Sequence, residues 1–222
     1  MYTDKPVKVG GPAYGSPCDT FESGMYVKSG IVFTSRGCNN NCAFCCVPER
    51  EGKLKEFATI CQGNIIQDNN FLQTSKEHKD KVFQMLESQK GICFKGGLQA
   101  KLIDAHFIEN IQRLRISELW IACDTSAAIP VSVDAVGQLK KAGFTREHIR
   151  CYVLIGDDMD ENEYRLQAVY KAGAMPFAML YQPTDTKLEY DHTWKKFHRM
   201  WSRPAAIVAH CERGTNMWNY GT

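Results

Sequence analysis

The chain alternates between short apolar runs and longer stretches in which apolar residues recur every three or four positions. The short runs have the length and the β-branched content of strands. They predict six strands, at Gly30–Ser35, Asn64–Gln67, Gly91–Lys95, Glu118–Cys123, Arg150–Ile155 and Pro176–Tyr181. A seventh, weaker candidate is Ile207–Ala209.

The stretches between these runs have helical spacing. Their apolar faces predict helices over residues 76–90, 102–115, 131–143, 160–172 and 191–201. Regular strand–helix alternation implies an α/β fold with parallel strands and right-handed crossovers. Six such units close only part of a barrel, so a partial (β/α)6 barrel and an open doubly wound sheet are both consistent with the pattern. In either fold the active site gathers at the carboxyl ends of the strands.

The chain divides into three parts. Residues 1–24 are rich in Gly, Pro and Ser and show no periodicity, which is typical of an N-terminal arm or connector. Residues 25–205 contain the strand–helix alternation and form the folded domain, and residues 206–222 form a C-terminal tail.

Composition places the chain among soluble globular proteins, with 44% hydrophobic residues, 23% charged residues and a formal charge of +2 over 222 residues. No apolar run approaches the roughly 18–20 residues that span a membrane, and the N-terminus lacks the layout of a secretory signal. The chain has ten cysteines. Cys93, Cys123 and Cys151 lie in apolar stretches, where a free thiol behaves as a small hydrophobe. We therefore expect a reducing, cytoplasmic compartment.

Three further cysteines, Cys38, Cys42 and Cys45, form a C-x3-C-x2-C run directly after the first predicted strand. Three thiolates on one loop can each bind one iron of a cubane cluster. The fourth iron then has no protein ligand and is open to a small molecule. A structural zinc site is the main alternative, but zinc takes four ligands, usually as two separated pairs, and Cys46 is badly placed to be the fourth.

The cysteine run, with Phe44 before its last cysteine and Ser-Arg-Gly before its first, resembles the signature of the radical S-adenosylmethionine (SAM) superfamily. The resemblance covers roughly residues 25–205 and is closest to cobalamin-associated members, without their cobalamin domain. It implies a partial barrel, a [4Fe–4S] cluster on the three cysteines, and SAM chelated to the open iron. It also implies an electron donor such as flavodoxin or ferredoxin. Reductive cleavage of SAM would give a 5′-deoxyadenosyl radical that abstracts hydrogen from a substrate, for rearrangement, oxidation or methyl transfer.

The same resemblance suggests residues that contact SAM. The amino group is assigned either to Asp68, Asn69 and Asn70 or to Gly96 and Gly97; ribose to Asp124 and Ser126; and adenine to Ile155. Phe44 and Tyr181, which ends the sixth predicted strand, complete the candidate set. Each polar group also has a simpler interpretation, as a turn or as the cap of the following helix. The chain departs from the family pattern at Asn39, where many members have Pro, and in lacking a Gly-Gly-Glu element after the second strand.

Two segments allow a functional and a structural interpretation. Residues 157–161 are acidic enough for a metal site, but acids also favour a helix N-terminus, which we expect here. Residues 194–204 interleave basic and aromatic residues, a mixture that can bind nucleic acid; at helical spacing we favour a packed helix. The prediction of a nucleoside or nucleic acid substrate rests on this segment alone. The competing function is a non-catalytic zinc or iron–sulfur module, such as a nucleic-acid adaptor. No catalytic side chain is identified.

Overall fold

The computed structural model describes residues 28–213, so the predicted arm and most of the predicted tail lie outside it. Its centre is a parallel sheet with the strand order β1-β4-β5-β6-β7-β8. The strands are β1 (Ile31–Val32), β4 (Ile65–Ile66), β5 (Ile92–Leu98), β6 (Ile116–Ala122), β7 (Ile149–Ile155) and β8 (Met175–Leu180). The six principal predicted strands and the α/β class are therefore confirmed.

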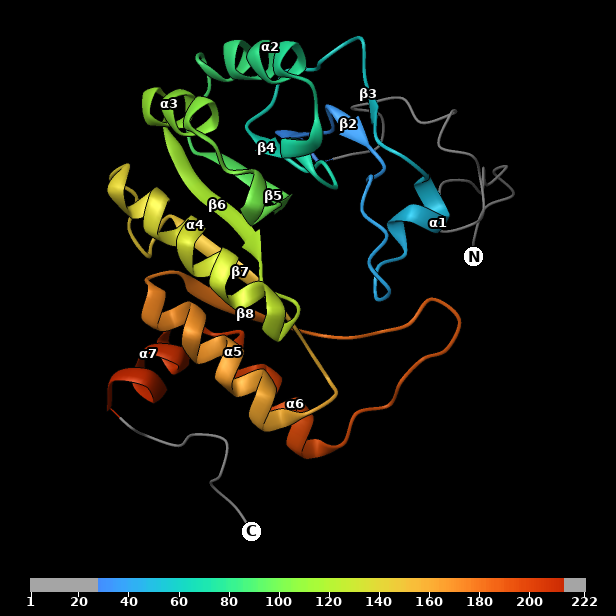
Figure 1. The fold of residues 1–222 in the computed structure, drawn as a ribbon, viewed down its shortest axis with the longest axis vertical. Helices are drawn as coiled ribbons and strands as arrows, with labels where there is room; N and C mark the ends of the chain where they lie inside the picture. Colours follow the sequence, from blue (N-terminus) through green and yellow to red (C-terminus); the bar gives the residue numbers. More distant parts are fainter. Residues whose placement is uncertain (1–27, 214–222) are drawn as a thin grey trace, which may run out of the picture.

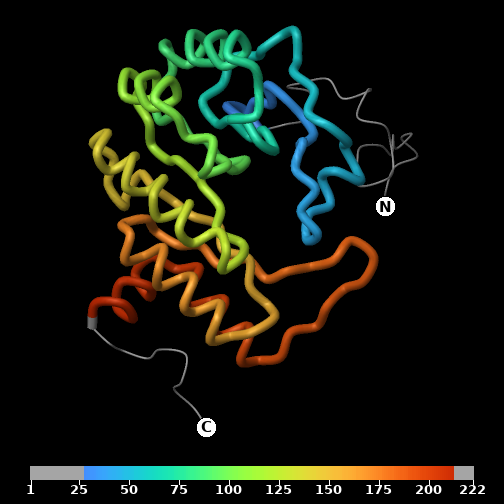
Figure 2. The backbone as a smooth tube through the Cα atoms, viewed as in Figure 1, coloured from blue at the N-terminus to red at the C-terminus, as the bar shows by residue number. Residues whose placement is uncertain are grey.

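Helices follow the strands from β4 onward. They are α2 (Lys76–Leu86), α3 (Ala105–Arg113), α4 (Ile129–Lys141), α5 (Met159–Ala172), α6 (His192–Trp201) and α7 (Pro204–Arg213). Figures 1 and 2 show α2 to α5 in a row along one side of the sheet. Because the strand order follows the chain without a reversal point, this architecture is compatible with a partial (β/α)6 barrel.

A second, two-stranded sheet closes the segment that contains the cysteine run. In it β2 (Ser35–Arg36) pairs antiparallel with β3 (Lys55–Glu56), and α1 (Val47–Glu51) lies between them. The sequence pattern did not predict this sheet or α1. Because both ends of the loop meet at this sheet, the loop starts and ends beside the carboxyl end of β1. Three short 3-10 helices, η3 (Phe71–Gln73), η4 (Ala100–Leu102) and η5 (Ser126–Ala128), lie between strands and the helices that follow them.

The core lies between the sheet and its row of helices. Alternate residues of each strand face it: Leu119 and Ile121 of β6 and Val153 of β7 are fully buried. Cys123 and Cys151 are also fully buried there as free thiols, as the sequence predicts. Residues at these alternate positions face the helices. The residues between them lie on the opposite face of the sheet, which this row of helices does not cover.

The helix caps resolve one of the alternatives left by the sequence. Asp158 caps α5 by accepting a hydrogen bond from the Glu161 amide at 2.9 Å, so this part of the acidic segment acts as a helix start. In the described residues no metal-binding group involves it. The basic and aromatic segment forms α6, and Phe197 and Trp201 are fully buried. These two rings are therefore part of the core, as the packed-helix interpretation expects, whereas Trp194 is only partly buried.

Several boundaries differ from the prediction. Ile207–Ala209 is not a strand but part of α7, with Ile207 in the core, because three apolar residues fit one turn of a helix as well as a strand. The predicted domain boundary at residue 205 therefore falls inside α7. Gly96 and Gly97 lie within β5, which continues to Leu98 through a register shift. Among residues 28–213, no helix combines the length and apolarity needed to cross a bilayer.

Gly96 provides a test of this packing. A Cβ at Gly96 would lie 1.7 Å from the backbone oxygen of Asp68, so Gly96→Ala forces β4 and β5 apart. We expect a loss of about 3 kcal/mol in the free energy of unfolding. At Gly137 in α4 nothing lies within 4 Å of such a Cβ, and Gly137→Ala should gain about 0.5–1 kcal/mol because alanine is the better helix former. Urea unfolding of both variants measures this; equal shifts for the two would contradict the close approach.

Candidate functional site

The cysteine loop is held at its stem by backbone contacts. The Cys38 amide donates to the Gly52 carbonyl at 3.1 Å, and the Gly37 amide donates to Glu51 Oε2 at 3.2 Å. Glu51 also pairs with Arg36. Gly37 has φ +79°, and its Cβ position would lie 2.3 Å from the Lys53 carbonyl oxygen, so only glycine fits. Figures 1 and 2 show the loop on the side of the sheet opposite the row of helices.

The three thiols of the run are free. Cys38 and Cys42 are partly buried and Cys45 is exposed. Burial raises the pKa of Cys42, and the neighbouring Cys38 and Asp124 raise it further. Burial also raises the pKa of Cys45. A hydrogen bond to the Val47 backbone opposes this rise, and the other cysteines of the loop add to it. Any metal must therefore displace protons to bind here. Within residues 28–213, no three His, Cys, Asp or Glu side chains are grouped closely enough to hold one metal ion.

A set of amides surrounds the sulfur of Cys38. The Asn40 backbone amide and Asn70 Nδ2 lie 3.4 and 3.8 Å from Cys38 Sγ, and the thiol donates to Gln73 Oε1 at 3.6 Å. Gln99 Oε1 accepts from Asn70 Nδ2 at 2.9 Å and from Gln73 Nε2 at 3.0 Å. The cysteine loop, the end of β4 and the end of β5 are thus joined through side-chain amides. Sequence reasoning missed Gln73 and Gln99, whose only signal was their position near strand ends.

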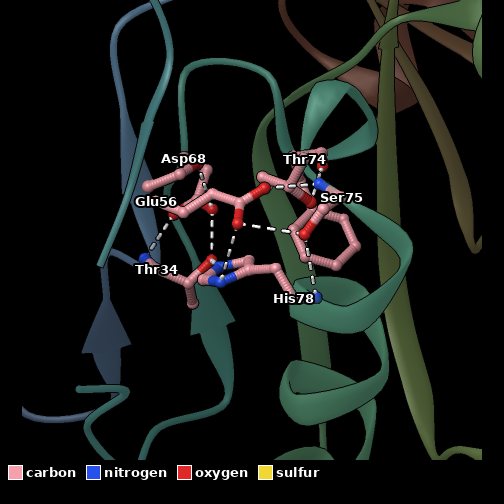
Figure 3. Close-up of polar contacts among 8 residues, drawn as sticks. Thr34, Glu56, Asp68, Thr74, Ser75 and His78 are labelled. Carbon is pink, nitrogen blue, oxygen red and sulfur yellow. Dashed lines mark hydrogen bonds and ion pairs between the residues drawn. The ribbon is translucent and has the colours of Figure 1, made fainter. Parts of the chain in front are cut away.

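Asp68 anchors the start of the loop. It is 1% exposed, and its carboxylate accepts from the Thr34 amide at 2.6 Å, from the Thr34 hydroxyl and from the Ser35 hydroxyl at 2.8 Å. Burial raises its pKa in spite of these bonds. The predicted contact between the Asp68 side chain and SAM is therefore not supported, because the chain's own donors surround the carboxylate (Figure 3).

The same network reaches α2. His78 Nε2 lies 3.1 Å from the Thr34 hydroxyl oxygen; because that hydroxyl donates its one proton to Asp68, His78 is the donor. Its other ring nitrogen lies 3.8 Å from a carboxylate oxygen of Glu56. Glu56 accepts from the hydroxyl of Ser75, the residue that caps α2, at 3.0 Å. The network links β3, the end of β4, the start of the cysteine loop and α2.

Two asparagine oxygens beside this anchor have no partner. Asn69 Oδ1 and Asn70 Oδ1 are buried and accept no hydrogen bond from the described residues, and Asn70 is 5% exposed. Buried polar atoms are nearly always paired, because an unpaired one pays the full cost of desolvation. A donor from a ligand would complete these two oxygens, and contact of Asn69 and Asn70 with SAM stays a prediction.

The glycine pair divides into two different roles. Gly96 lies against the backbone of Asp68, so the close approach expected there is to the protein itself and not to a ligand. Gly97 has φ +104° and open space around its Cβ position. Of the two, only Gly97 is placed where a ligand has room.

The end of β6 contributes Asp124 and Ser126. Asp124 Oδ1 accepts from the Leu154 amide at 3.0 Å, and burial raises the pKa of Asp124. The Ser126 hydroxyl donates to Glu161. Neither caps α4, whose N-cap is Ala128, so the alternative interpretation as a cap is wrong. Contact with ribose stays a prediction.

The remaining candidates come from β7, β8 and the loop. Ile155 is 1% exposed in the helix-covered core, so its side chain is turned away from any ligand at the open side, and the predicted packing against adenine is not supported. Tyr181 is partly buried directly after β8, and its amide donates to the Ile155 carbonyl at 2.9 Å. Phe44 is partly buried between Cys42 and Cys45.

Comparison with known proteins gives no relative for this chain: no family model, curated protein or solved structure matches it significantly.

The anchor predicts a pH dependence of stability. Burial lowers the pKa of His78 below its ordinary value of 6.5, so the folded state binds this proton more weakly than the unfolded state. The contribution of neutral His78 to the free energy of unfolding is fully present above the pKa that the residue has in the unfolded state. It is lost as the pH falls through the pKa of the folded state. We expect His78→Gln, which keeps a donor for Thr34, to flatten the fall in urea-unfolding stability between about pH 7 and pH 5. The exposed His192 serves as the control: an equal flattening in His192→Gln would contradict the assignment.

Proposed function

We propose that this chain is a radical SAM enzyme in which Cys38, Cys42 and Cys45 bind a [4Fe–4S] cluster. One observation carries the proposal: a single loop at the carboxyl edge of a parallel sheet carries three free thiols, and Asn70, whose Nδ2 lies beside Cys38 Sγ, has a buried oxygen that accepts no hydrogen bond from the described residues. When bound, the cluster and SAM supply reductive cleavage of the sulfonium to methionine and a 5′-deoxyadenosyl radical that abstracts hydrogen from substrate. The chain's own residues supply binding and orientation.

The surroundings of Cys38 fit a thiolate ligand of a cluster. The Asn40 amide and Asn70 Nδ2 both lie within reach of its sulfur, and N–H donors stabilise a thiolate and tune an iron–sulfur centre. The Gln73 oxygen that accepts the thiol proton would have to turn away once the proton is lost. Cys45 is exposed, and we propose that an electron donor such as flavodoxin or ferredoxin approaches the cluster there.

The two unpaired oxygens fit the ammonium group of SAM. An ammonium offers three donors and no acceptor, and its hydrogen bonds to amide oxygens are stronger than neutral ones. Asn69 and Asn70 are close to Cys38 along the same edge, where Asn70 Nδ2 lies 3.8 Å from the sulfur. Asp124 raises the pKa of Cys42, and we propose that it contacts the ribose.

Anaerobic reconstitution with iron and sulfide tests the proposal. We expect a brown protein with about four irons per chain that forms 5′-deoxyadenosine when SAM and dithionite are added. A colourless protein with one tightly bound zinc would instead establish a structural metal site. Colour without 5′-deoxyadenosine would leave an iron–sulfur protein that does not cleave SAM; both outcomes refute the proposed activity.

A matched pair of variants tests the ligand assignment. Cys42→Ala should abolish cluster assembly, because it removes one of three irreplaceable ligands. Cys46→Ala should leave the iron content unchanged, since Cys46 is the N-cap position of α1 and is not one of the proposed ligands. Iron and sulfide analysis after reconstitution decides the matter. Full iron content in the first variant or loss of iron in the second would mean that the ligands are wrongly assigned.

A further inference from the structure

The face of the sheet that the helices do not cover carries an aromatic group. Trp120 of β6, Tyr152 of β7 and Phe177 of β8 alternate with fully buried core residues and are each partly buried. Trp120 and Tyr152 are stacked, with ring centroids 4.3 Å apart and planes at 27°. Phe177 meets them edge-on at 5.7 and 6.2 Å. These contacts place the three rings on one face, across three neighbouring strands.

The polar atoms of this aromatic group are already satisfied. Trp120 Nε1 donates to Glu118 Oε2 at 2.9 Å, and the Tyr152 hydroxyl donates to the Lys95 carbonyl at 3.1 Å. The Tyr152 side chain therefore reaches across β6 to β5 and is fixed at both ends. A ligand would therefore meet only the part of the ring surface that the three rings do not cover in one another, and such surface favours stacking with another planar group.

Charged residues border the rings. Lys95 pairs with Glu118 at 3.2 Å. Burial opposes ionisation of Glu118, but hydrogen bonds from Trp120 and Lys95, with the charges of Lys95 and Arg150, lower its pKa overall. One carboxylate thus lies between two cations. Arg150 Nε is buried, and among the described residues it has no hydrogen-bond partner. The surplus is one positive charge, which favours an anionic ligand.

The aromatic face lies along the strands that lead to the carboxyl edge of the sheet, where the cysteine loop is. Trp120 precedes Asp124 by four residues, about 13 Å along the strand direction, and Asp124 is near enough to Cys42 to raise its pKa. In Figure 2 the cysteine loop and the segment after β8 both lie on this open side of the sheet. A molecule stacked on the rings would face the carboxyl edge where the cysteines lie.

We propose that the face formed by Trp120, Tyr152 and Phe177 binds the substrate, and that the substrate is a planar aromatic or heteroaromatic molecule carrying a negative charge near Arg150. That this molecule is the substrate rests on the proposed function, whereas its binding to this face does not. The ring surfaces recognise the planar part and the guanidinium recognises the anion.

Binding of three probes to the full chain tests the inference, both before reconstitution and with the cluster in place. Nicotinate is planar and anionic, nicotinamide is planar and neutral, and cyclohexanecarboxylate is anionic but not planar. Saturation-transfer NMR titrations at millimolar concentration give their relative affinities. We expect nicotinate to bind about tenfold more tightly than either of the other two probes. Nicotinamide lacks the charge-assisted hydrogen bond, and cyclohexanecarboxylate lacks the stacking contact.

Variants identify the site. Trp120→Leu should weaken nicotinate binding about tenfold, and Arg150→Gln should abolish the preference for nicotinate over nicotinamide. Tyr164→Leu and Arg199→Gln, at exposed positions of α5 and α6, are the matched controls and should change neither value. Tyr152→Phe keeps the ring and should retain binding, which guards against a folding defect in Trp120→Leu.

The outcomes separate the two proposals. If nicotinate binds no better than cyclohexanecarboxylate, or if Trp120→Leu and Arg150→Gln behave as the controls do, the rings serve only for packing and the inference is overturned. If nicotinate binds as expected but no 5′-deoxyadenosine forms on reconstitution, the binding face stands and the radical SAM proposal fails.

Discussion

The arrangement of the site depends on one buried carboxylate. Asp68 is almost completely inaccessible to solvent, and a buried charge is tolerated only when several donors surround it. The donors come from Thr34 and Ser35, the residues that lead from β1 into the cysteine loop. The carboxylate therefore fixes the point at which the loop leaves the sheet. Cys38 follows Ser35 by three residues, so this anchor also determines the position of Cys38.

Parallel strands impose the second constraint, because their carboxyl ends must meet at one edge. At that edge Gly96 allows β5 to approach the backbone of Asp68 more closely than any side chain would permit. The close approach brings Gln99, after β5, within hydrogen-bonding distance of Asn70, after β4. The amide network around Cys38 is thus a consequence of strand packing as much as of the loop's own sequence.

These constraints explain which features the sequence could predict. Periodicity located the strands because alternate positions are either buried or not, and the acidic run at residues 157–161 indicated a helix start, which the structure places at Asp158. Position at a strand end singled out Asp68 and Ile155 as ligand contacts, but it does not determine which way a side chain points. Asp68 turns inward to the loop and Ile155 turns to the helices. Gln73 carries no motif, since its role depends on contacts between segments distant in the chain.

The two faces of the sheet have different compositions, and this difference has a physical meaning. Toward the helices, β6 presents fully buried aliphatic residues such as Leu119 and Ile121. On the opposite face the same strand presents Glu118 and Trp120, whose neighbours include Lys95 and Arg150. Charged side chains cost free energy in a dry interior and add nothing to apolar packing. A face that combines rings with a surplus cation is better suited to a polar planar ligand than to a second layer of protein.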